Sequence, residues 1–461
     1  MSTFLWRAAL GGCVLRVALL TRRRIAILGA GGRDFHNYNI LFRDNADYEV
    51  VAFVFTQIPR QAGRTYPPQL AGKMYPDGIP IVDMSELKNL VQDQGVEEVL
   101  LAFSDLTYEK AMDIETTILS YGAHVKLASP SKTMLVSSKP VVAICGVRTG
   151  VGKSTVTRYA VKVFSKMGAK AVVIRHPMAY GDLLAKNVLH FRAAADILED
   201  NALTIEERGE YLTLVESGAE TYAGVDYARV LDEAERNADV VVWDGGNNDV
   251  SFIKPDLYIT VADATRPGQE VGSYPGELNI LLADVVVINK VGAASRADAK
   301  KIADNISAIN PNAKIIRASM PPKLDKPSLI KGKRVLVVED GPTVTHGGRP
   351  YAAAYMAAQK NSPKRIVDPR PYAQGSIKDL YRSYPWMGKV LPAVGYDEQQ
   401  VNDLMDTAKI VPCDSIVYDI ITGLGDKLSE IRPVARVSYA LREEKGEPLK
   451  KVLTSFYRSH G

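Results

Sequence analysis

Apolar runs of strand length alternate with amphipathic segments along most of the chain. The first third has four such runs, residues 24–30, 49–56, 97–103 and 124–128, and two segments with apolar residues at helical spacing, 85–94 and 108–121. Strands that alternate with helices pack into parallel sheets covered by helices on both faces. The pattern predicts an N-terminal Rossmann-like α/β domain over residues 24–137.

The alternation continues beyond residue 138. Further apolar runs of strand length cover residues 141–146, 169–176, 238–244, 257–263, 283–289 and 334–340. From residue 341 the chain is rich in turn-forming residues and in Thr, His, Arg and Tyr, and long polar loops are common sites of ligand binding. We predict a P-loop α/β domain over residues 138–340 and a loop-rich C-terminal region over residues 341–461 that completes a substrate site.

A glycine-rich turn, Gly29-Ala-Gly-Gly-Arg-Asp-Phe-His36, follows the first expected strand. It is similar to a dinucleotide-binding turn, but Asp34 replaces the third glycine of the G-x-G-x-x-G pattern, and no acidic residue ends the second strand. These departures disfavour NAD binding. We expect a site for an anionic ligand that includes Arg33, or a domain contact, and a purely structural turn is the alternative.

The prediction of a P-loop rests on the segment Gly146-Val-Arg-Thr-Gly-Val-Gly-Lys-Ser-Thr155, which joins a strand to a helical pattern. In such a loop the backbone N–H groups and the helix N-terminus bind phosphate oxygens. Lys153 is expected to reach the β- and γ-phosphates, and the Ser154 hydroxyl to bind Mg²⁺. The predicted nucleotide-binding residues of the loop are Thr149, Gly150, Val151, Gly152, Lys153, Ser154 and Thr155.

The loop departs from the G-x-x-x-x-G-K-[ST] pattern, because Val147 stands at the position of the first glycine. It is similar to the K-G-G-V-G-K-[ST] loop of deviant Walker ATPases, with Arg148 in place of their signature lysine. A second cation suits phosphoryl transfer, in which negative charge spreads over the transferred oxygens. We therefore expect Lys153 and Arg148 to be catalytic, together with Asp244.

Two strand ends add to the nucleotide site. Asp244 ends the apolar run 238–244, the arrangement in which a carboxylate beside the phosphate loop binds Mg²⁺ directly or through water. Residues 289–292 resemble the guanine motif N-K-x-D, but Gly292 replaces the aspartate that recognises guanine. Loss of that carboxylate favours ATP over GTP. Asn289 and Lys290 are expected to pack against the base.

Composition limits the classes of partner and compartment. Of the 461 residues, 24% are charged, and a net charge of +4 gives no indication of nucleic-acid or membrane binding. The three cysteines show no metal-binding or disulfide spacing. The apolar stretch 5–20 is followed by arginines, which is the wrong order for a signal peptide, and it is too short to cross a membrane. We expect residues 1–23 to be a tail and the protein to be cytoplasmic.

Four motifs, in this order along the chain, resemble those of the archaeal cyclic 2,3-diphosphoglycerate synthetases: residues 32–37, 148–154, 339–347 and 368–373. The resemblance covers residues 24–440. It implies an ATP- and Mg²⁺-dependent ligase that closes 2,3-bisphosphoglycerate into a cyclic pyrophosphate and releases ADP and phosphate. It also implies activation by K⁺ and a homodimer.

The implied substrate is a polyanion, so we expect arginines that bind phosphate bidentately around it. The candidate substrate residues are Arg33, Arg175, His176, Arg266, Thr345, His346 and Arg370. Two other classes of function stay open. One is a P-loop switch or chaperone that acts on a protein partner, and the other is a kinase of a different small anionic metabolite.

Overall fold

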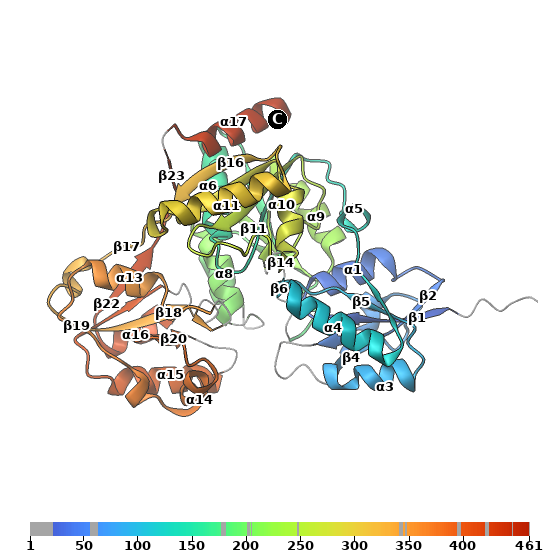
Figure 1. Cartoon of the computed structure of the whole chain (residues 1–461), viewed down its shortest axis with the longest axis horizontal. Coiled ribbons are helices and arrows are strands. Elements are labelled where there is room, and N and C mark those ends of the chain that lie inside the picture. The colour runs from blue at the N-terminus through green and yellow to red at the C-terminus, as the bar shows by residue number, and fades with distance from the viewer. Residues whose placement is uncertain are drawn as a thin grey trace, which may run out of the picture.

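The computed structural model describes residues 22–55, 63–176, 181–200, 203, 205–246, 249–340, 344–345, 348–393, 398–419, 424–444 and 446–460. These residues form three α/β units, each built on its own large sheet (Figure 1). They are the N-terminal unit (residues 23–133), the central unit (141–319 and 442–460) and the C-terminal unit (323–438). Nearly all of the predicted tail and His346 lie outside the described residues.

The N-terminal unit has six strands in the order β3-β4-β2-β1-β5-β7, parallel except for β3. The strands are β1 (Arg23–Leu28), β2 (Tyr48–Phe55), β3 (Arg64–Tyr66), β4 (Ile79–Asp83), β5 (Glu98–Leu101) and β7 (His124–Lys126), and the helices are α1 (Arg33–Leu41), α2 (Pro68–Ala71), α3 (Leu87–Gln92), α4 (Tyr108–Tyr121) and α5 (Pro130–Thr133). Ile25 and Ile27 pack into one core and Ala26 and Leu28 into another. Residues 25–28 of β1 are all apolar because helices cover both faces of the sheet.

The central unit has nine strands in the order β10-β11-β9-β12-β8-β13-β15-β16-β23, antiparallel only at the two edges. The strands are β8 (Val141–Gly146), β9 (Ala171–Arg175), β10 (Val188–Phe191), β11 (Glu220–Gly224), β12 (Val240–Asp244), β13 (Leu257–Asp263), β15 (Val285–Asn289), β16 (Lys314–Ser319) and β23 (Arg442–Glu443). The helices are α6 (Lys153–Lys166), α7 (Ala194–Leu198), α8 (Ile205–Val215), α9 (Tyr227–Glu235), α10 (Gly276–Leu281), α11 (Arg296–Ile309) and α17 (Pro448–His460). The apolar runs predicted between residues 141 and 289 are therefore strands of one sheet.

The C-terminal region is more regular than its turn-rich sequence suggested, and the expectation of a loop-rich extension is wrong. It forms a sheet in the order β17-β22-β21-β18-β19, with β20 also paired to β18. Its strands are β17 (Lys323–Leu324), β18 (Arg334–Asp340), β19 (Arg365–Ile366), β20 (Leu391–Ala393), β21 (Ser415–Tyr418) and β22 (Val434–Ser438), and its helices are α13 (Ala353–Lys360), α14 (Gly375–Ser383), α15 (Glu398–Ile410) and α16 (Leu424–Ile431). The chain then returns to the central sheet, where Phe456 of α17 packs near Phe164 of α6.

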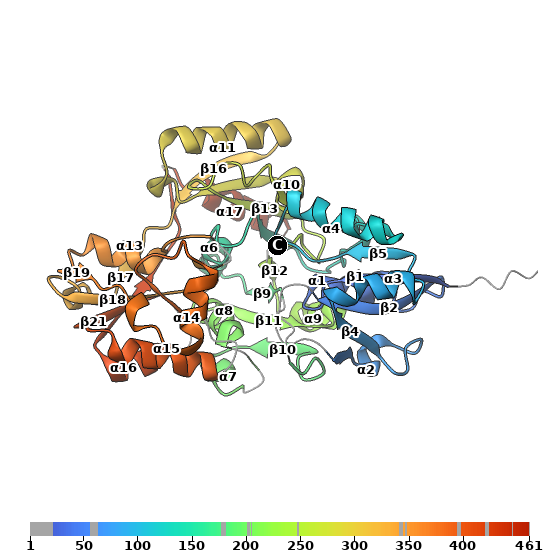
Figure 2. The same ribbon diagram turned by 60° about the horizontal axis from the view of Figure 1, so that its bottom comes forward.

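The N-terminal and C-terminal units flank the central unit on opposite sides in both views (Figures 1 and 2). A short antiparallel ladder between β6 (Leu106–Thr107) and β14 (Ser273–Tyr274) joins the N-terminal unit to the central one. The phosphate loop follows β8, so it lies at the carboxyl end of the central sheet, where ligands bind in open α/β sheets. Across the described part of the chain, no helix has the length and apolar character needed to span a membrane.

Candidate nucleotide and substrate site

The predicted phosphate loop lies between β8 and the first residue of α6, Lys153. Gly150 and Gly152 have φ angles of +79° and +101°, and a Cβ atom on Gly152 would lie 2.3 Å from Asn289 Nδ2. Both positions therefore require glycine. At Gly146, a Cβ atom would lie 2.9 Å from Lys153 Cδ, so the glycine lets the lysine fold back over the loop.

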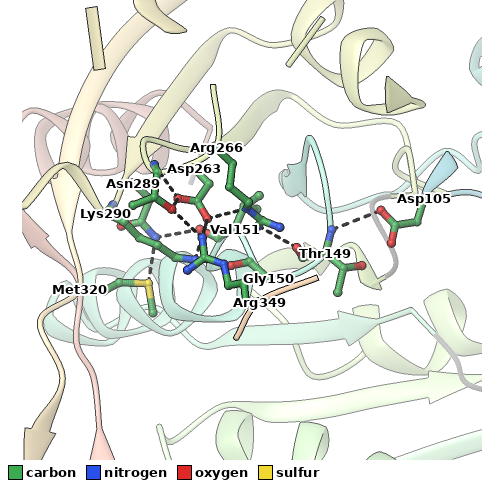
Figure 3. A network of polar contacts seen from close by, with 11 residues as sticks. Asp105, Thr149, Gly150, Val151, Asp263, Arg266, Asn289, Lys290, Met320 and Arg349 are labelled. Atoms are coloured by element: carbon green, nitrogen blue, oxygen red, sulfur yellow. Dashed lines mark hydrogen bonds and ion pairs between the residues drawn. The ribbon is translucent and has the colours of Figure 1, made fainter. Parts of the chain in front are cut away.

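Three side chains hold the carbonyl groups of this loop from outside (Figure 3). Arg266 Nη2 donates to the Thr149 carbonyl at 2.9 Å, Lys290 Nζ donates to that of Gly150, and Asn289 Nδ2 donates to that of Val151 at 3.0 Å. In a trans peptide the next N–H points opposite to the carbonyl. The N–H groups of residues 150–152 are therefore turned away from these side chains, as phosphate binding requires.

This arrangement places three sequence-predicted residues at the loop backbone. Asn289 and Lys290, expected against the base, and Arg266, expected at the substrate, all donate to loop carbonyls. Asn289 Nδ2 also lies 3.1 Å from the sulfur of Met320.

Asp263, at the end of β13, connects these cations. Its Oδ2 lies 3.0 Å from Arg266 Nε, 2.9 Å from Lys290 Nζ and 2.8 Å from Nη2 of Arg349, which comes from the C-terminal unit. Burial alone would raise the pKa of Asp263, but the three cations outweigh it and hold that pKa well below its usual range. Burial lowers the pKa of Lys290 to about 8. Three cations on one carboxylate leave two positive charges in excess beside the phosphate loop.

Asp244 lies beside Ser154, as the Mg²⁺ prediction requires. Arg175 Nη1 donates to Asp244 Oδ2 at 2.5 Å and to Ser154 Oγ at 3.3 Å, and its Nη2 pairs with Glu210 at 2.7 Å. Burial disfavours the charge of Arg175, but the two carboxylates outweigh it and raise the Arg175 pKa. Arg175, predicted to bind substrate, is thus held between two acids.

The second oxygen of Asp244, Oδ1, is buried and has no hydrogen-bond partner among the described residues. An unpaired carboxylate oxygen beside a serine hydroxyl suits Mg²⁺, which takes its remaining ligands from phosphates and water. No group of three or more His, Cys, Asp or Glu side chains suitable for a metal occurs in the part of the chain that the structure describes. Ser154 and Asp244, which share the Arg175 guanidinium, are the residues that would hold the ion.

Lys153 is buried over the loop. Burial lowers the pKa of its ammonium group, and the nearby Arg175 charge lowers it further. A phosphate group in the loop would offset this loss of hydration.

Arg148 is held by an aspartate for which no sequence pattern predicted a role. Asp105, from the N-terminal unit, lies 2.8 Å from Arg148 Nε and accepts from the Thr149 N–H at 3.3 Å. Its φ of +65° is unusual for a residue other than glycine, and such conformations cluster at functional sites. The carboxylate thus uses two donors of the loop that also suit a phosphate.

The N–H groups of the turn after β1 are bonded to Asp34. Asp34 Oδ1 accepts from the N–H groups of Gly31, Gly32 and Phe35 at 3.0, 2.9 and 2.8 Å. These are the donors that a pyrophosphate would need. The aspartate that departs from the glycine pattern thus closes the turn with its own side chain.

Two predicted substrate residues, Arg33 and His176, meet at Asp249. Arg33 Nη1 lies 3.9 Å from Asp249 Oδ1, and His176 Nε2 faces Asp249 Oδ2. The neighbouring His36 stacks on Phe252 with ring centroids 4.3 Å apart, and burial lowers the pKa of His36 to about 4. The N-terminal turn is therefore a contact with the central unit.

The remaining predicted substrate residues lie in the C-terminal unit. Thr345 is buried, and Arg370 pairs with Asp368 at the surface of the unit, 2.5 Å away. Arg370 forms no hydrogen bond or ion pair with the phosphate loop within the described ranges. Arg349 is the residue of this unit that reaches the nucleotide loop region, through Asp263 and Thr265.

Comparisons with known proteins identify the family. The sequence model of the P-loop domain of cyclic 2,3-diphosphoglycerate synthetase matches residues 183–319. The arginine synthetase of Thermococcus kodakarensis is 48% identical over 439 residues, which cover 95% of this chain and 98% of that protein. The chain belongs to the cyclic 2,3-diphosphoglycerate synthetase family.

Relatives in this family that carry the family's own name are more distant. The cyclic 2,3-diphosphoglycerate synthetase of Thermococcus sibiricus is 27% identical and covers 56% of this chain and 64% of its own length. The one from Thermococcus kodakarensis is 24% identical and covers 53% of this chain and 63% of its own length. The predicted resemblance is confirmed, and the family together with the phosphate loop supports an ATP-dependent ligase.

Proposed function

We propose that this chain is an ATP-dependent arginine synthetase. The proposal is supported by comparing this chain with two relatives from the same organism. In Thermococcus kodakarensis the relative named arginine synthetase is 48% identical to this chain, whereas the cyclic 2,3-diphosphoglycerate synthetase is 24% identical. Because both relatives come from the same species, the difference reflects divergence between the two proteins and not between organisms.

The chemistry follows from the product. Arginine differs from the ureido amino acid citrulline by one nitrogen in place of oxygen. The ureido oxygen attacks the γ-phosphorus of ATP, the bond to ADP breaks, and an O-phosphorylated isourea forms. Ammonia then attacks the isourea carbon, phosphate leaves with the electron pair of the C–O bond, and a proton from the nitrogen passes to the medium. The overall reaction consumes citrulline, ammonia and ATP and yields arginine, ADP and phosphate.

The residues of the site have roles in this reaction. Lys153 and the N–H groups of residues 150–152 would bind the phosphates, and Arg148 would neutralise charge on the transferred group. Ser154 and Asp244 would hold Mg²⁺, which neutralises phosphate charge when bound. Arg266, Lys290 and Asn289 keep the loop carbonyls turned outward.

One structural observation favours a zwitterionic substrate over a polyanion. The cations predicted to bind a bisphosphate are compensated by acids: Arg33 and His176 by Asp249, and Arg175 by Asp244 and Glu210. A polyanion at these positions would meet three carboxylates, and like charges brought together are strongly unfavourable. An α-amino acid, which has one charge of each sign, meets no such excess.

Synthesis of cyclic 2,3-diphosphoglycerate is the second candidate. It is favoured by the match of the family model over residues 183–319 and by the two positive charges in excess around Asp263. The K⁺ activation and the homodimer implied by the resemblance belong to this proposal. For either reaction, we propose that residues 24–137 act as a Rossmann-like domain that closes over the substrate at the phosphate loop.

The test is to incubate the protein with Mg-ATP, citrulline and an ammonium salt and to measure arginine and ADP. Arginine formed in equal amount to ADP is the expected result, with the Lys153→Ala variant as the inactive control. In parallel, 2,3-bisphosphoglycerate replaces citrulline, and phosphorus resonances are followed for a cyclic pyrophosphate doublet. A doublet in the absence of any arginine formation would overturn the proposal and establish the second candidate.

A further inference from the structure

A group of buried polar atoms lies where α1 meets the central unit. Both polar atoms of the Asn37 amide, Arg33 Nη1, His176 Nδ1, Asp249 Oδ1 and Trp243 Nε1 have no hydrogen-bond partner within the ranges that the structure describes. Each of these side chains is at most 4% exposed. Buried polar groups in folded proteins are nearly always paired, so a concentration of unpaired ones at a junction of two units requires an explanation.

The atoms face a common region. Arg33 and Asn37 are four residues apart on α1 and therefore lie on one face of the helix. That face meets the central unit, because Arg33 pairs with Asp249 and because His36 stacks on Phe252, which also contacts the ring of His176.

The region adjoins the predicted site of phosphoryl transfer. His176 directly follows Arg175, which bonds both Asp244 and Ser154, and the His176 N–H donates to the Asp244 carbonyl at 3.2 Å. Trp243 directly precedes Asp244 on β12, so its side chain lies on the other face of the sheet but at the same carboxyl end. A molecule bound by these side chains would therefore lie at the end of the central sheet that carries the phosphate loop.

We propose that this junction is the binding site of an α-amino acid substrate, with Arg33 on its carboxylate, Asp249 on its ammonium group and Asn37 as both donor and acceptor. The proposal rests on the function proposed above and assigns its amino-acid site. Arg33 and Asp249 have opposite charges and lie 3.9 Å apart, longer than a hydrogen-bonded pair, so each has bonding capacity for a zwitterion. The amide of Asn37 has the donor and acceptor groups that match those of a ureido group.

The depth of these side chains also determines how the ligand enters. Exposure of at most 4% means that the substrate reaches them only when α1 moves away from the central unit. The N-terminal unit then closes over the amino acid and excludes water from the reaction, as closing domains do in other enzymes.

Asn37→Leu is the decisive variant, and Asn39→Leu on the same helix is its matched control. An apolar side chain at residue 37 removes a buried amide that has no hydrogen-bond partner among the described residues, so the melting temperature stays equal or rises. The citrulline KM rises about tenfold or more, because the site loses both hydrogen bonds. Asn39 accepts from the Tyr66 hydroxyl at 3.1 Å, so Asn39→Leu lowers the melting temperature and leaves the citrulline KM unchanged.

Arg33→Lys is the second variant, since it keeps the charge but loses bidentate binding of a carboxylate. Its citrulline KM rises about tenfold, while the ATP KM stays within about twofold of the wild-type value. A wild-type enzyme that forms arginine, together with an unchanged citrulline KM in both Asn37→Leu and Arg33→Lys, would overturn the proposal. A lower melting temperature of Asn37→Leu with unchanged KM would do the same and would make Asn37 a structural residue.

Failure of the proposed function has a different signature. Isothermal titration of the wild-type protein with citrulline, arginine and a panel of other α-amino acids measures the site without turnover. In one outcome the wild-type protein binds another α-amino acid, Asn37→Leu does not bind it, and no arginine is formed. This outcome supports the amino-acid site and refutes the proposed arginine synthetase activity. No binding of any α-amino acid by a protein that closes 2,3-bisphosphoglycerate would refute both.

Discussion

Asp105 of the N-terminal unit holds Arg148 of the phosphate loop at 2.8 Å, and the same carboxylate accepts the Thr149 N–H. The two residues are far apart in the sequence and belong to different units. Since a nucleotide phosphate would use the Thr149 N–H and would be repelled by this carboxylate, occupation of the loop by ATP and its contact with the N-terminal unit are coupled.

The Asp105→Asn variant is expected to bind ATP more tightly. Asparagine tolerates the positive φ of this position but removes the negative charge that repels a phosphate at the Thr149 N–H. An interaction between partly exposed charges is worth about 1 kcal/mol, which corresponds to about a fivefold lower Kd. Titration with a non-hydrolysable ATP analogue measures this Kd. The control is Asp113→Asn on the exposed face of α4. A higher ATP Kd in this variant would mean that Asp105 stabilises the nucleotide-binding conformation of the loop.

Lys153→Ala is expected to lower kcat about a hundredfold or more, because it removes the cation that neutralises charge at the γ-phosphate. The melting temperature should not fall, since Lys153 is buried and burial lowers the pKa of its ammonium group. Steady-state ADP release and thermal unfolding are the two measurements. Retention of more than about a tenth of the wild-type kcat would contradict the assignment.

Arg148→Ala is expected to impair chemistry more than ATP binding. Asp105 holds Arg148 in the described structure, so Arg148 is available to the transferred phosphoryl group only when that contact breaks. An interaction made only in the transition state lowers kcat and kcat/KM together and leaves the ATP Kd unchanged. A large rise in the ATP Kd with a normal kcat would show that Arg148 serves only to bind nucleotide.

ATP is expected to bind more tightly than GTP. Gly292 cannot supply the carboxylate that recognises guanine, and its N–H donates to Ser319 Oγ at 3.2 Å. A Cβ atom at residue 292 would lie 3.2 Å from that oxygen, so an aspartate would be crowded there. Competition titrations compare the two nucleotides, and equal or tighter GTP binding would be the contrary result.

Stability should depend on pH through Lys290. Burial lowers its folded pKa to about 8 from 10.5, so between these values the unfolded chain holds more protons than the folded one. The free energy of unfolding therefore rises with pH across this window, by up to about 1.4 kcal/mol per pH unit. The measurement is the difference between wild type and Lys290→Met in chemical denaturation at pH 7.5 to about 10.5. If the difference in free energy of unfolding between the two proteins does not change with pH, Lys290 has an ordinary pKa.

The parts of this site that depend on a short stretch of sequence could be predicted. The loop 146–155, the alternation of strands and helices, and Asp244 at the end of β12 follow from patterns within one strand and its next turn. Asp263 ends β13 in the same way and had the same signal, although only the structure shows that it gathers three cations.

Other features depend on contacts between distant segments, which no local pattern contains. Asp105 reaches the loop because the β6–β14 ladder joins the two units, and Arg349 reaches Asp263 from the C-terminal unit. The C-terminal sheet was missed because its strands are short and separated by turn-rich segments that are typical of loops.

The return of the chain to the central sheet has a mechanical consequence. Residues 320–322 lead into the C-terminal unit and residues 439–441 lead out of it. The flanking strands pair on both sides of these connections, Ser319 with Arg442 and Lys323 with Ser438. The unit is thus connected to the central sheet by a two-stranded ribbon. A bend of this ribbon would move Arg349 relative to Asp263, so the ion pair and the ribbon together determine the position of the C-terminal unit.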